Sequence, residues 1–118
     1  MTLTIDNSNS APFVSLLSPQ DGQRLSMADN MIEGVSRDND GSVSRVDITV
    51  RDIYNGDIVV HQQSVTEFEA NGGWSTDWDP TILQHDFEYD IDVRSYDGYD
   101  YSEMTTITVV ADNPSDAG

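Results

Sequence analysis

The 118-residue chain is predicted to be all-β, with the fold of an antiparallel β-sandwich of about seven strands. In segments 43–53 and 87–95 apolar residues alternate with polar ones, the period of a strand with one buried face. Among the turn signals between apolar runs, Asn55-Gly56 is the strongest for a hairpin, because both residues tolerate positive φ. A helical period fits neither alternating segment, so strands are expected there.

Pro, Gly, Asn and Asp residues bound the remaining apolar runs, and Gly34 suggests a bulge in one of them. Seven short strands at close spacing are typical of an immunoglobulin-like sandwich. The expected strands are 12–18, 30–36, 43–53, a return strand beginning at 58–60, 74–78, 87–95 and 103–111.

The inward positions of these strands define the expected core. Trp74 and Trp78 share one strand face and are assigned to the core, because sandwiches more often bury tryptophans than expose them as a sugar-stacking platform. Tyr96, Tyr99 and Tyr101 bracket the last hairpin and are expected to cover the end of the sandwich, with a binding loop as the alternative. The other expected core residues are Val14, Leu16, Ile32, Val46, Ile48, Val50, Tyr89, Ile91, Val93, Ile107 and Val109.

Acidic residues dominate the charge: 22 Asp and Glu stand against five Arg, without any Lys, and the net charge is −17. Such a charge repels nucleic acid and anionic membranes, so neither is an expected partner. It fits a self-repelling soluble surface, adaptation to high salt, or loops loaded with divalent cations. The chain has no Cys, so neither disulfides nor thiolate metal sites hold the fold.

The outward positions of segment 87–95 carry an acid row, Glu88, Asp90 and Asp92. In an immunoglobulin-like sandwich the third and sixth strands are neighbours in one sheet, so Arg45 and Arg51 are expected across from this row. Cross-strand pairs of opposite charge contribute about 0.2–1 kcal/mol each. The row is therefore interpreted as a solvated, paired face and not as catalytic acids.

The sharpest metal-site hypothesis concerns two loops. Carboxylates alternate in the segment 38–41, where Asp38 and Asp40 precede a glycine, and Asp97 and Asp100 bracket the last hairpin turn. Both loops belong to one end of the expected sandwich, so their oxygens are predicted to hold Ca²⁺. The alternative is a plain Asx turn that forms without metal. The spacing does not match an EF-hand, since strands flank the loop.

Catalysis is not expected. His61 lies on a strand and His85 in a loop, and the chain has neither a cysteine nor a nucleophile elbow. The adjacent His85 and Asp86 do not make a triad, because a base and its orienting acid must meet in space. The chain is therefore predicted not to be an enzyme.

A series of short motifs extends over residues 11–114. They are Ala11-Pro12-x-Val14, Ser18-Pro19-x-Asp21-Gly22, Ile32-x-Gly34, Asp38-Asn39-Asp40-Gly41-Ser42-Val43, Gly73-Trp74, Trp78-Asp79-x-Thr81-x-Leu83, Tyr89-x-Ile91-x-Val93-Arg94, Tyr96-Asp97-Gly98 and Val109 followed by Asp112-Asn113-Pro114. Together they resemble bacterial and archaeal Ig-like repeat domains, whose fold is similar to fibronectin type III and PKD-like domains. One segment departs from that pattern: 84–88 stands where the family commonly has Asp-Gly.

The resemblance implies a module that recurs as a spacer, stalk or accessory domain in large exported proteins. Residues 1–10 are interpreted as a linker or the tail of a preceding repeat, 11–112 as the Ig-like sandwich and 113–118 as a linker. The expected function is a non-catalytic structural or adhesion repeat of a secreted or cell-surface protein, rigidified by calcium. The alternative is an accessory carbohydrate- or ligand-binding module of a secreted hydrolase.

The expected location is extracellular or at the cell surface. Expected partners are neighbouring repeats of the same chain, with a glycan or a surface protein as a further ligand. In isolation the module is expected to be a monomer, because its surface repels itself.

Overall fold

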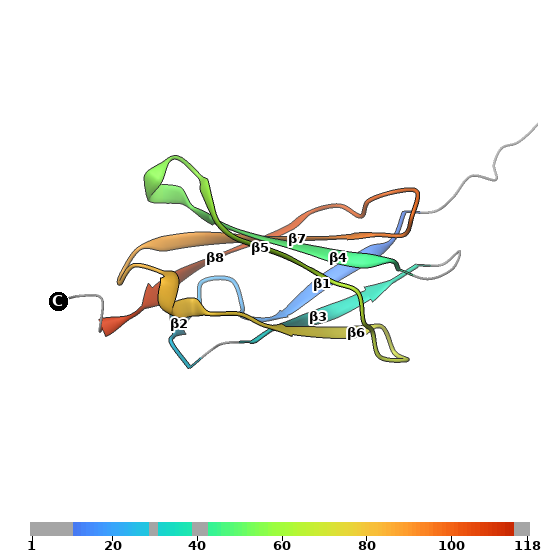
Figure 1. Ribbon diagram of the computed structural model, residues 1–118, viewed down its shortest axis with the longest axis horizontal. Helices are drawn as coiled ribbons and strands as arrows, with labels where there is room; N and C mark the ends of the chain where they lie inside the picture. Colours follow the sequence, from blue (N-terminus) through green and yellow to red (C-terminus); the bar gives the residue numbers. More distant parts are fainter. Residues whose placement is uncertain (1–10, 29–30, 39–42, 115–118) are drawn as a thin grey trace, which may run out of the picture.

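The computed structural model describes residues 11–28, 31–38 and 43–114, which form two β-sheets packed face to face (Figure 1). The all-β sandwich predicted from the sequence is confirmed. The elements in chain order are β1 (Phe13–Ser18), β2 (Arg24–Ser26), β3 (Met31–Arg37), β4 (Arg45–Asp52), the short 3₁₀ helix η2 (Ile53–Asn55), β5 (Ile58–Val65), β6 (Gly73–Asp77), a second 3₁₀ helix η3 (Pro80–Ile82), β7 (Glu88–Tyr96) and β8 (Thr105–Asp112).

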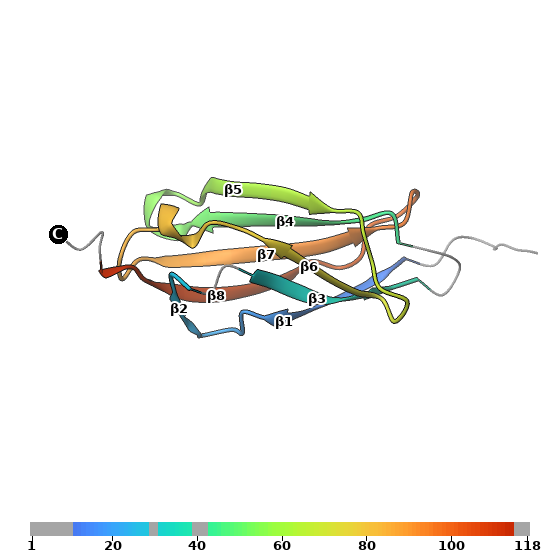
Figure 2. The same ribbon diagram turned by 60° about the horizontal axis from the view of Figure 1, so that its bottom comes forward.

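One sheet has three strands in the order β1-β3-β6, and the other has five in the order β2-β8-β7-β4-β5. Figure 2 shows β5, β4, β7 and β8 side by side in that order. Neighbouring strands run antiparallel, apart from β2, which runs parallel to β8. The sequence did not predict β2, because a three-residue strand is too short to show alternation. Its central residue, Leu25, is nevertheless fully buried.

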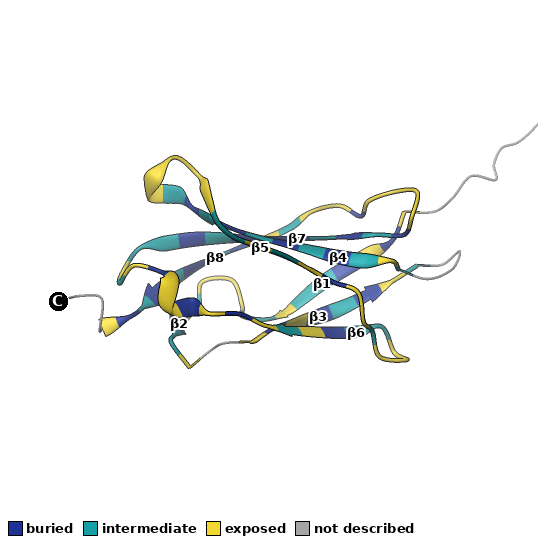
Figure 3. Ribbon diagram, viewed as in Figure 1, coloured by how far each residue is buried: buried dark blue, intermediate teal, exposed yellow. Residues whose placement is uncertain are grey.

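Alternation along β4 and β7 places one side of each strand in the core. Ile48 pairs with Val93 and Val50 with Ile91, and all four side chains are completely buried. The residues between them point to the outer face of the larger sheet. Figure 3 shows the resulting banding of buried and less buried residues along these central strands.

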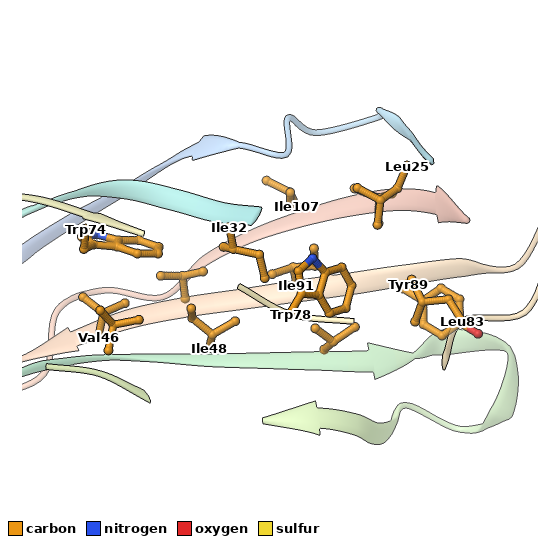
Figure 4. Packing of buried hydrophobic residues seen from close by; sticks show 14 of the residues in the cluster. Leu25, Ile32, Val46, Ile48, Trp74, Trp78, Leu83, Tyr89, Ile91 and Ile107 are labelled. Atoms are coloured by element: carbon orange, nitrogen blue, oxygen red, sulfur yellow. The ribbon is translucent and has the colours of Figure 1, made fainter. Parts of the chain in front are cut away.

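Buried apolar side chains from both sheets meet between the layers. In Figure 4, Ile32 and Trp74 from the smaller sheet point toward Val46 and Ile48 of the larger one. The predicted core is confirmed at every position except Leu16, which is only half-buried and packs against the rim of the cluster. Four buried members were not predicted from strand alternation: Leu25, Val65, Leu83 and Ala111.

Gly34 lets the smaller sheet close tightly around Trp74. A Cβ placed on Gly34 would lie 2.1 Å from the Ser15 carbonyl oxygen and 2.6 Å from Trp74 Cζ2. No side chain fits in that space, because real Cβ atoms do not approach backbone oxygen so closely. The bulge suggested at Gly34 instead lies in the partner strand, between Leu16 and Ser18.

The β4–β5 hairpin forms as predicted, but its turn is longer than two residues. Helix η2 occupies the first part, and Asp52 caps it by accepting a hydrogen bond from Tyr54 N at 3.0 Å. Positive φ occurs at Gly56 and Asp57, one residue later than the Asn55-Gly56 pattern suggests. The buried Asp52 cap explains the difference, because it stabilises a helical turn before the chain reverses.

Segment 84–88, which departs from the Ig-like repeat pattern, still contains a residue in a turn conformation. Asp86 has φ of +63°, the left-handed conformation that a glycine adopts without cost. Asp is among the few other residues that adopt it, because its short side chain bonds locally. An aspartate thus takes the place of the glycine in that pattern without changing the direction of the chain.

Asn113 fixes the end of β8 to the body of the domain. Its backbone N–H donates to His85 Nδ1 at 3.0 Å, and its side-chain amide donates to the carbonyl oxygens of Leu83 at 2.8 Å and Thr81 at 3.2 Å. The side chain is buried, so the packed unit extends at least to this residue. Segment 115–118, like 1–10, lies outside the described residues. Within the described ranges no helix has the length and apolar character needed to cross a membrane.

Candidate functional site

Arg51 organises the outer face of the larger sheet. Its guanidinium makes two hydrogen bonds to Asp92, Nε to Oδ2 at 2.6 Å and Nη2 to Oδ1 at 3.1 Å. The same group reaches Asp90 at 3.2 Å and Asp57 at 3.0 Å, and the hydrogen bond to Asp92 raises the pKa of Arg51. Thr106 completes the site by donating to Asp92 at 2.7 Å. The expected pairing of Arg51 with the acid row is confirmed.

Arg45 is placed differently from the prediction. The antiparallel register puts it opposite Tyr96, at the far end of β7 from the acid row. Arg45 instead pairs with Asp47 on its own strand at 3.0 Å, and its guanidinium lies 4.4 Å from the Tyr96 ring centroid. It also donates to the Tyr101 hydroxyl at 2.9 Å. The expectation that Arg45 faces the acid row is therefore wrong, because it rested on strand order without register.

A polar groove of about 540 Å³ lies on this outer face. The register explains its shape: Gln62, Thr49 and Asp92 form one row across β5, β4 and β7, and 64, 47 and 94 form the next row. The lining residues are Arg45, Asp47, Thr49, Gln62, Gln63, Ser64, Asp92, Arg94 and Met104. These side chains offer hydrogen-bond donors and acceptors close together along three strands.

Arg94 has an aromatic partner but no acidic one. Its guanidinium carbon lies 3.9 Å from the Tyr101 ring centroid, a cation–π arrangement. Among the described residues its side chain makes no hydrogen bond and no ion pair. Nothing in the sequence singles out this arginine, although its outward position follows from the alternation of 87–95. Its neighbours in the groove come from strands that only the register brings together.

Three of the four predicted calcium residues, Asp38, Asp97 and Asp100, are among the described residues. The ends of β3 and β7 lie at the same end of the molecule, so the loops that follow them start close together (Figure 1). Asp97 Oδ1 accepts hydrogen bonds from the backbone N–H groups of Tyr99 and Asp100, both at 2.8 Å, which is an Asx-type loop closure. Asp38 follows β3, and Asp40 lies outside the described residues.

The described residues contain no group of three or more His, Cys, Asp or Glu side chains arranged to hold a metal ion. Because Asp40 is not among them, the predicted four-carboxylate set is not tested by this observation. Calcium binding stays a prediction.

The two histidines, His61 and His85, contact residues that maintain the fold. His61 contacts the Gln63 side chain, and its ring centroid lies 5.6 Å from that of Trp78. His85 accepts the backbone hydrogen bond of Asn113. Both histidines thus help to hold the fold together, at the open edge between the sheets and at the end of β8.

Trp74 and Trp78 are buried, with 3% and 6% of their surface exposed, so their assignment to the core is confirmed. A tryptophan platform on the surface is therefore ruled out for this pair. The rings of Tyr96 and Tyr101 pack in a tilted arrangement with 4.6 Å between their centroids, whereas Tyr99 at the loop tip is 81% exposed. Tyr96 and Tyr101 thus lie next to the two arginines of the groove.

The family comparison agrees with this architecture. The bacterial Ig domain family matches residues 12–109, which is most of the chain. The chain belongs to that family. Bacterial Ig domains are typically non-catalytic and commonly occur in exported or surface proteins. No curated protein sequence matches the chain.

Two solved structures are similar to this bacterial Ig domain. One is a crystal structure of an engineered protein, with a TM-score of 0.61 and 19% identity over 88% of this chain and 21% of that one. The chain thus spans about a fifth of that larger protein, and the likeness supports the fold alone. The other, a myokine structure, has a TM-score of 0.44 and 19% identity over 86% of this chain and 95% of that one.

Proposed function

We propose that this chain is a non-catalytic spacer module of a larger exported or cell-surface protein, with neighbouring modules as its partners. The observation that carries the proposal is the direction of the chain. Strand β1 begins at one end of the sandwich and β8 finishes at the opposite end (Figure 1). Modules joined through such ends extend in a line, and each one adds its own length to a stalk.

The contacts of β8 fit a module that carries load along its axis. Its last residues pair with β2 from Arg24↔Val110 to Ser26↔Asp112, and its other edge pairs with β7. A pull along the strands loads these ladder hydrogen bonds together, because they lie across the direction of the force. The hydrogen bonds of Asn113 then limit swivelling where the chain leaves the domain.

Force spectroscopy on several copies joined in series tests this proposal. We expect each copy to unfold as one unit at high force, and Asn113→Ala to lower that force. Ser75→Ala, on the exposed face of β6, is the control and should leave it unchanged. Unfolding of the wild-type copies without a measurable force peak would contradict a load-bearing spacer.

We also propose that Ca²⁺ stiffens the end of the module formed by Asp38, Asp40, Asp97 and Asp100. Strands β3 and β7, which precede the two acidic segments, finish at the same end of the sandwich, and hard cations prefer carboxylate oxygen. Millimolar CaCl₂ should raise the Tm more than NaCl at equal ionic strength, and Asp38→Asn with Asp40→Asn should remove the excess. Equal shifts from the two salts would show that the loops are only solvated.

A further inference from the structure

We propose that the groove on the outer face of β5, β4 and β7 binds a short stretch of neutral polysaccharide, with Arg94, Thr49 and Gln62 as its hydrogen-bonding residues. This inference goes beyond the spacer role, which does not need the groove. It also does not need the tryptophans, which are buried in the core.

The first argument is the number of polar groups that the fold leaves without partners. Arg94, Thr49 and Gln62 all line the groove, and none of their side chains makes a hydrogen bond or ion pair among the described residues. The guanidinium supplies only donors, whereas the amide and the hydroxyl both donate and accept. A sugar hydroxyl also donates and accepts at once, so a polyhydroxylated ligand satisfies all three side chains.

The second argument is preorganisation. The Tyr101 ring supports the Arg94 guanidinium at 3.9 Å, and Tyr101 is itself held by the hydrogen bond from Arg45. On the neighbouring strand β4, Asp47 is the cross-strand partner of Arg94 and accepts hydrogen bonds from Arg45 and from Ser64, the latter at 2.7 Å. Side chains that are already fixed lose little freedom when a ligand binds.

The third argument is charge. Two arginines and two aspartates line the groove, so their formal charges balance and the groove is close to neutral in a protein of net charge −17. The field of the whole surface opposes a polyanion. The polar lining opposes an apolar ligand, which needs hydrophobic walls. A neutral polysaccharide rich in hydroxyl groups is neither repelled by the negative surface nor mismatched to the polar lining.

Shape agrees with this ligand class. A volume of about 540 Å³ lies within the roughly 300–1,000 Å³ of ordinary ligand sites. Met104 lines the groove and is 53% exposed, which gives a small apolar surface for the C–H face of a sugar ring. The groove is open on the sheet surface, so a chain can continue beyond it.

The test is an NMR titration of the isotope-labelled domain with neutral and acidic oligosaccharides of equal length. The neutral probes are oligomers of cellulose, xylan and mannan, and the acidic probe is oligogalacturonate, each also measured in molar NaCl. We expect at least one neutral oligomer to shift the amides of Thr49, Gln62 and Arg94 in a saturable way. The acidic oligomer should bind more weakly at low salt.

Matched variants identify the residues. Arg94→Gln should weaken the affinity for the neutral oligomer about tenfold, because a charged donor is lost. Arg37→Gln is the control: it changes the net charge equally, and the Arg37 side chain is also unpaired among the described residues but lies on the smaller sheet. Its affinity should stay within about twofold of wild type. Thr49→Val, which keeps the branched shape, should weaken binding by a smaller factor.

Three outcomes would overturn the proposal. They are no saturable shift with any neutral oligomer, shifts confined to another face, and preferential binding of the acidic oligomer in both salt conditions. Equal affinities of the Arg94→Gln and Arg37→Gln variants would likewise rule out Arg94 as a contact. None of these results bears on force resistance, so failure here is separate from failure of the spacer proposal.

Discussion

Arginine and aspartate side chains cover the outer face of β4 and β7, whereas the outer face of β1 exposes apolar ones. On the larger sheet Arg51 joins Asp90 and Asp92 in one network. On the smaller sheet Phe13 and Leu17 are more than half exposed. The larger sheet is thus stabilised on both of its faces, whereas the smaller sheet depends on its inner face.

This contrast has a simple origin in strand position. Strands β4 and β7 are central in their sheet, so their outward side chains have cross-strand neighbours on both sides. In the smaller sheet only β3 has a neighbouring strand on each side. At Gly34 this strand has no side chain, and the Trp74 ring and the backbone of β1 pack directly against it. Changes at Gly34 and at Arg51 therefore test the two modes of stabilisation separately.

The largest effect is expected from Gly34→Ala. The added methyl group overlaps the Ser15 carbonyl oxygen and the Trp74 ring, so β1 and β6 must move apart. Overpacking of this kind costs about 3 kcal/mol of unfolding free energy. Urea unfolding should show this loss, while Ser75→Ala on the outer face should stay close to wild type. A Gly34→Ala protein as stable as wild type would mean that the smaller sheet is loosely packed.

The next effect is expected from Arg51→Met. Asp92 is almost fully buried, with 8% of its side chain exposed, and it would lose both guanidinium hydrogen bonds. Leaving such a carboxylate without its cation costs about 2 kcal/mol. Arg45→Met removes the ion pair to Asp47, the hydrogen bond to Tyr101 and the contact with the Tyr96 ring. All of these lie at a more exposed position and leave no buried carboxylate without its cation, so the loss should be clearly smaller. Equal losses in urea unfolding would show that burial does not set the strength of these pairs.

The inner faces and the network differ in how well sequence predicts them. Period-two alternation located the core of β4 and β7 correctly, since burial and side-chain period are linked. It could not locate Leu25 or Leu83, which lie in segments too short or too irregular to have a period. Leu16 is predicted to be fully buried but is only half-buried, because the bulge beside it interrupts the regular pairing of β1.

Register limits the prediction of the site. Sequence reasoning paired Arg51 with the acid row correctly but placed Arg45 there too, and one register decides both. The groove joins Gln62, Thr49 and Arg94 across three strands, and no local motif marks such a set. Chemical type alone indicated Asp38, Asp40, Asp97 and Asp100, because acidic loops are visible in sequence whereas cross-strand neighbours are not.

A smaller effect is expected from salt. Molar KCl should raise the Tm of the wild type by a few degrees, because screening to about 3 Å removes the repulsion of a −17 surface. The partly buried Arg51 network should lose little, since screening acts mainly on exposed charges. Arg51→Met leaves Asp57, Asp90 and Asp92 without their cation, so KCl should raise its Tm by more than that of the wild type. A fall of the wild-type Tm in KCl would contradict the electrostatic account.

The smallest effect is expected at the end of the larger sheet, where Arg24 and Asp86 form an exposed pair at 2.6 Å. The hydrogen bond from Arg24 holds the pKa of Asp86 below its usual value, and the positive charge of Arg24 acts in the same direction. A lowered folded-state pKa contributes stability above the unfolded pKa of about 4, and this contribution is lost as the pH falls through the folded value. Asp86→Asn should therefore lower the Tm slightly at neutral pH.

The difference between Asp86→Asn and wild type should shrink as the pH falls from about 4 and disappear below the lowered folded-state pKa of Asp86, where the wild-type carboxyl is also neutral. Asn keeps the backbone, because it adopts a φ of +63° as readily as Asp. The loss from Arg24→Gln, which also breaks the 3.5 Å ion pair to Asp112, should likewise shrink in acid, and the double variant should lose no more than Arg24→Gln alone. Thermal unfolding across this pH range provides the measurement. A Tm difference that persists in acid would show that Asp86 acts through the shape of its turn and not through its charge.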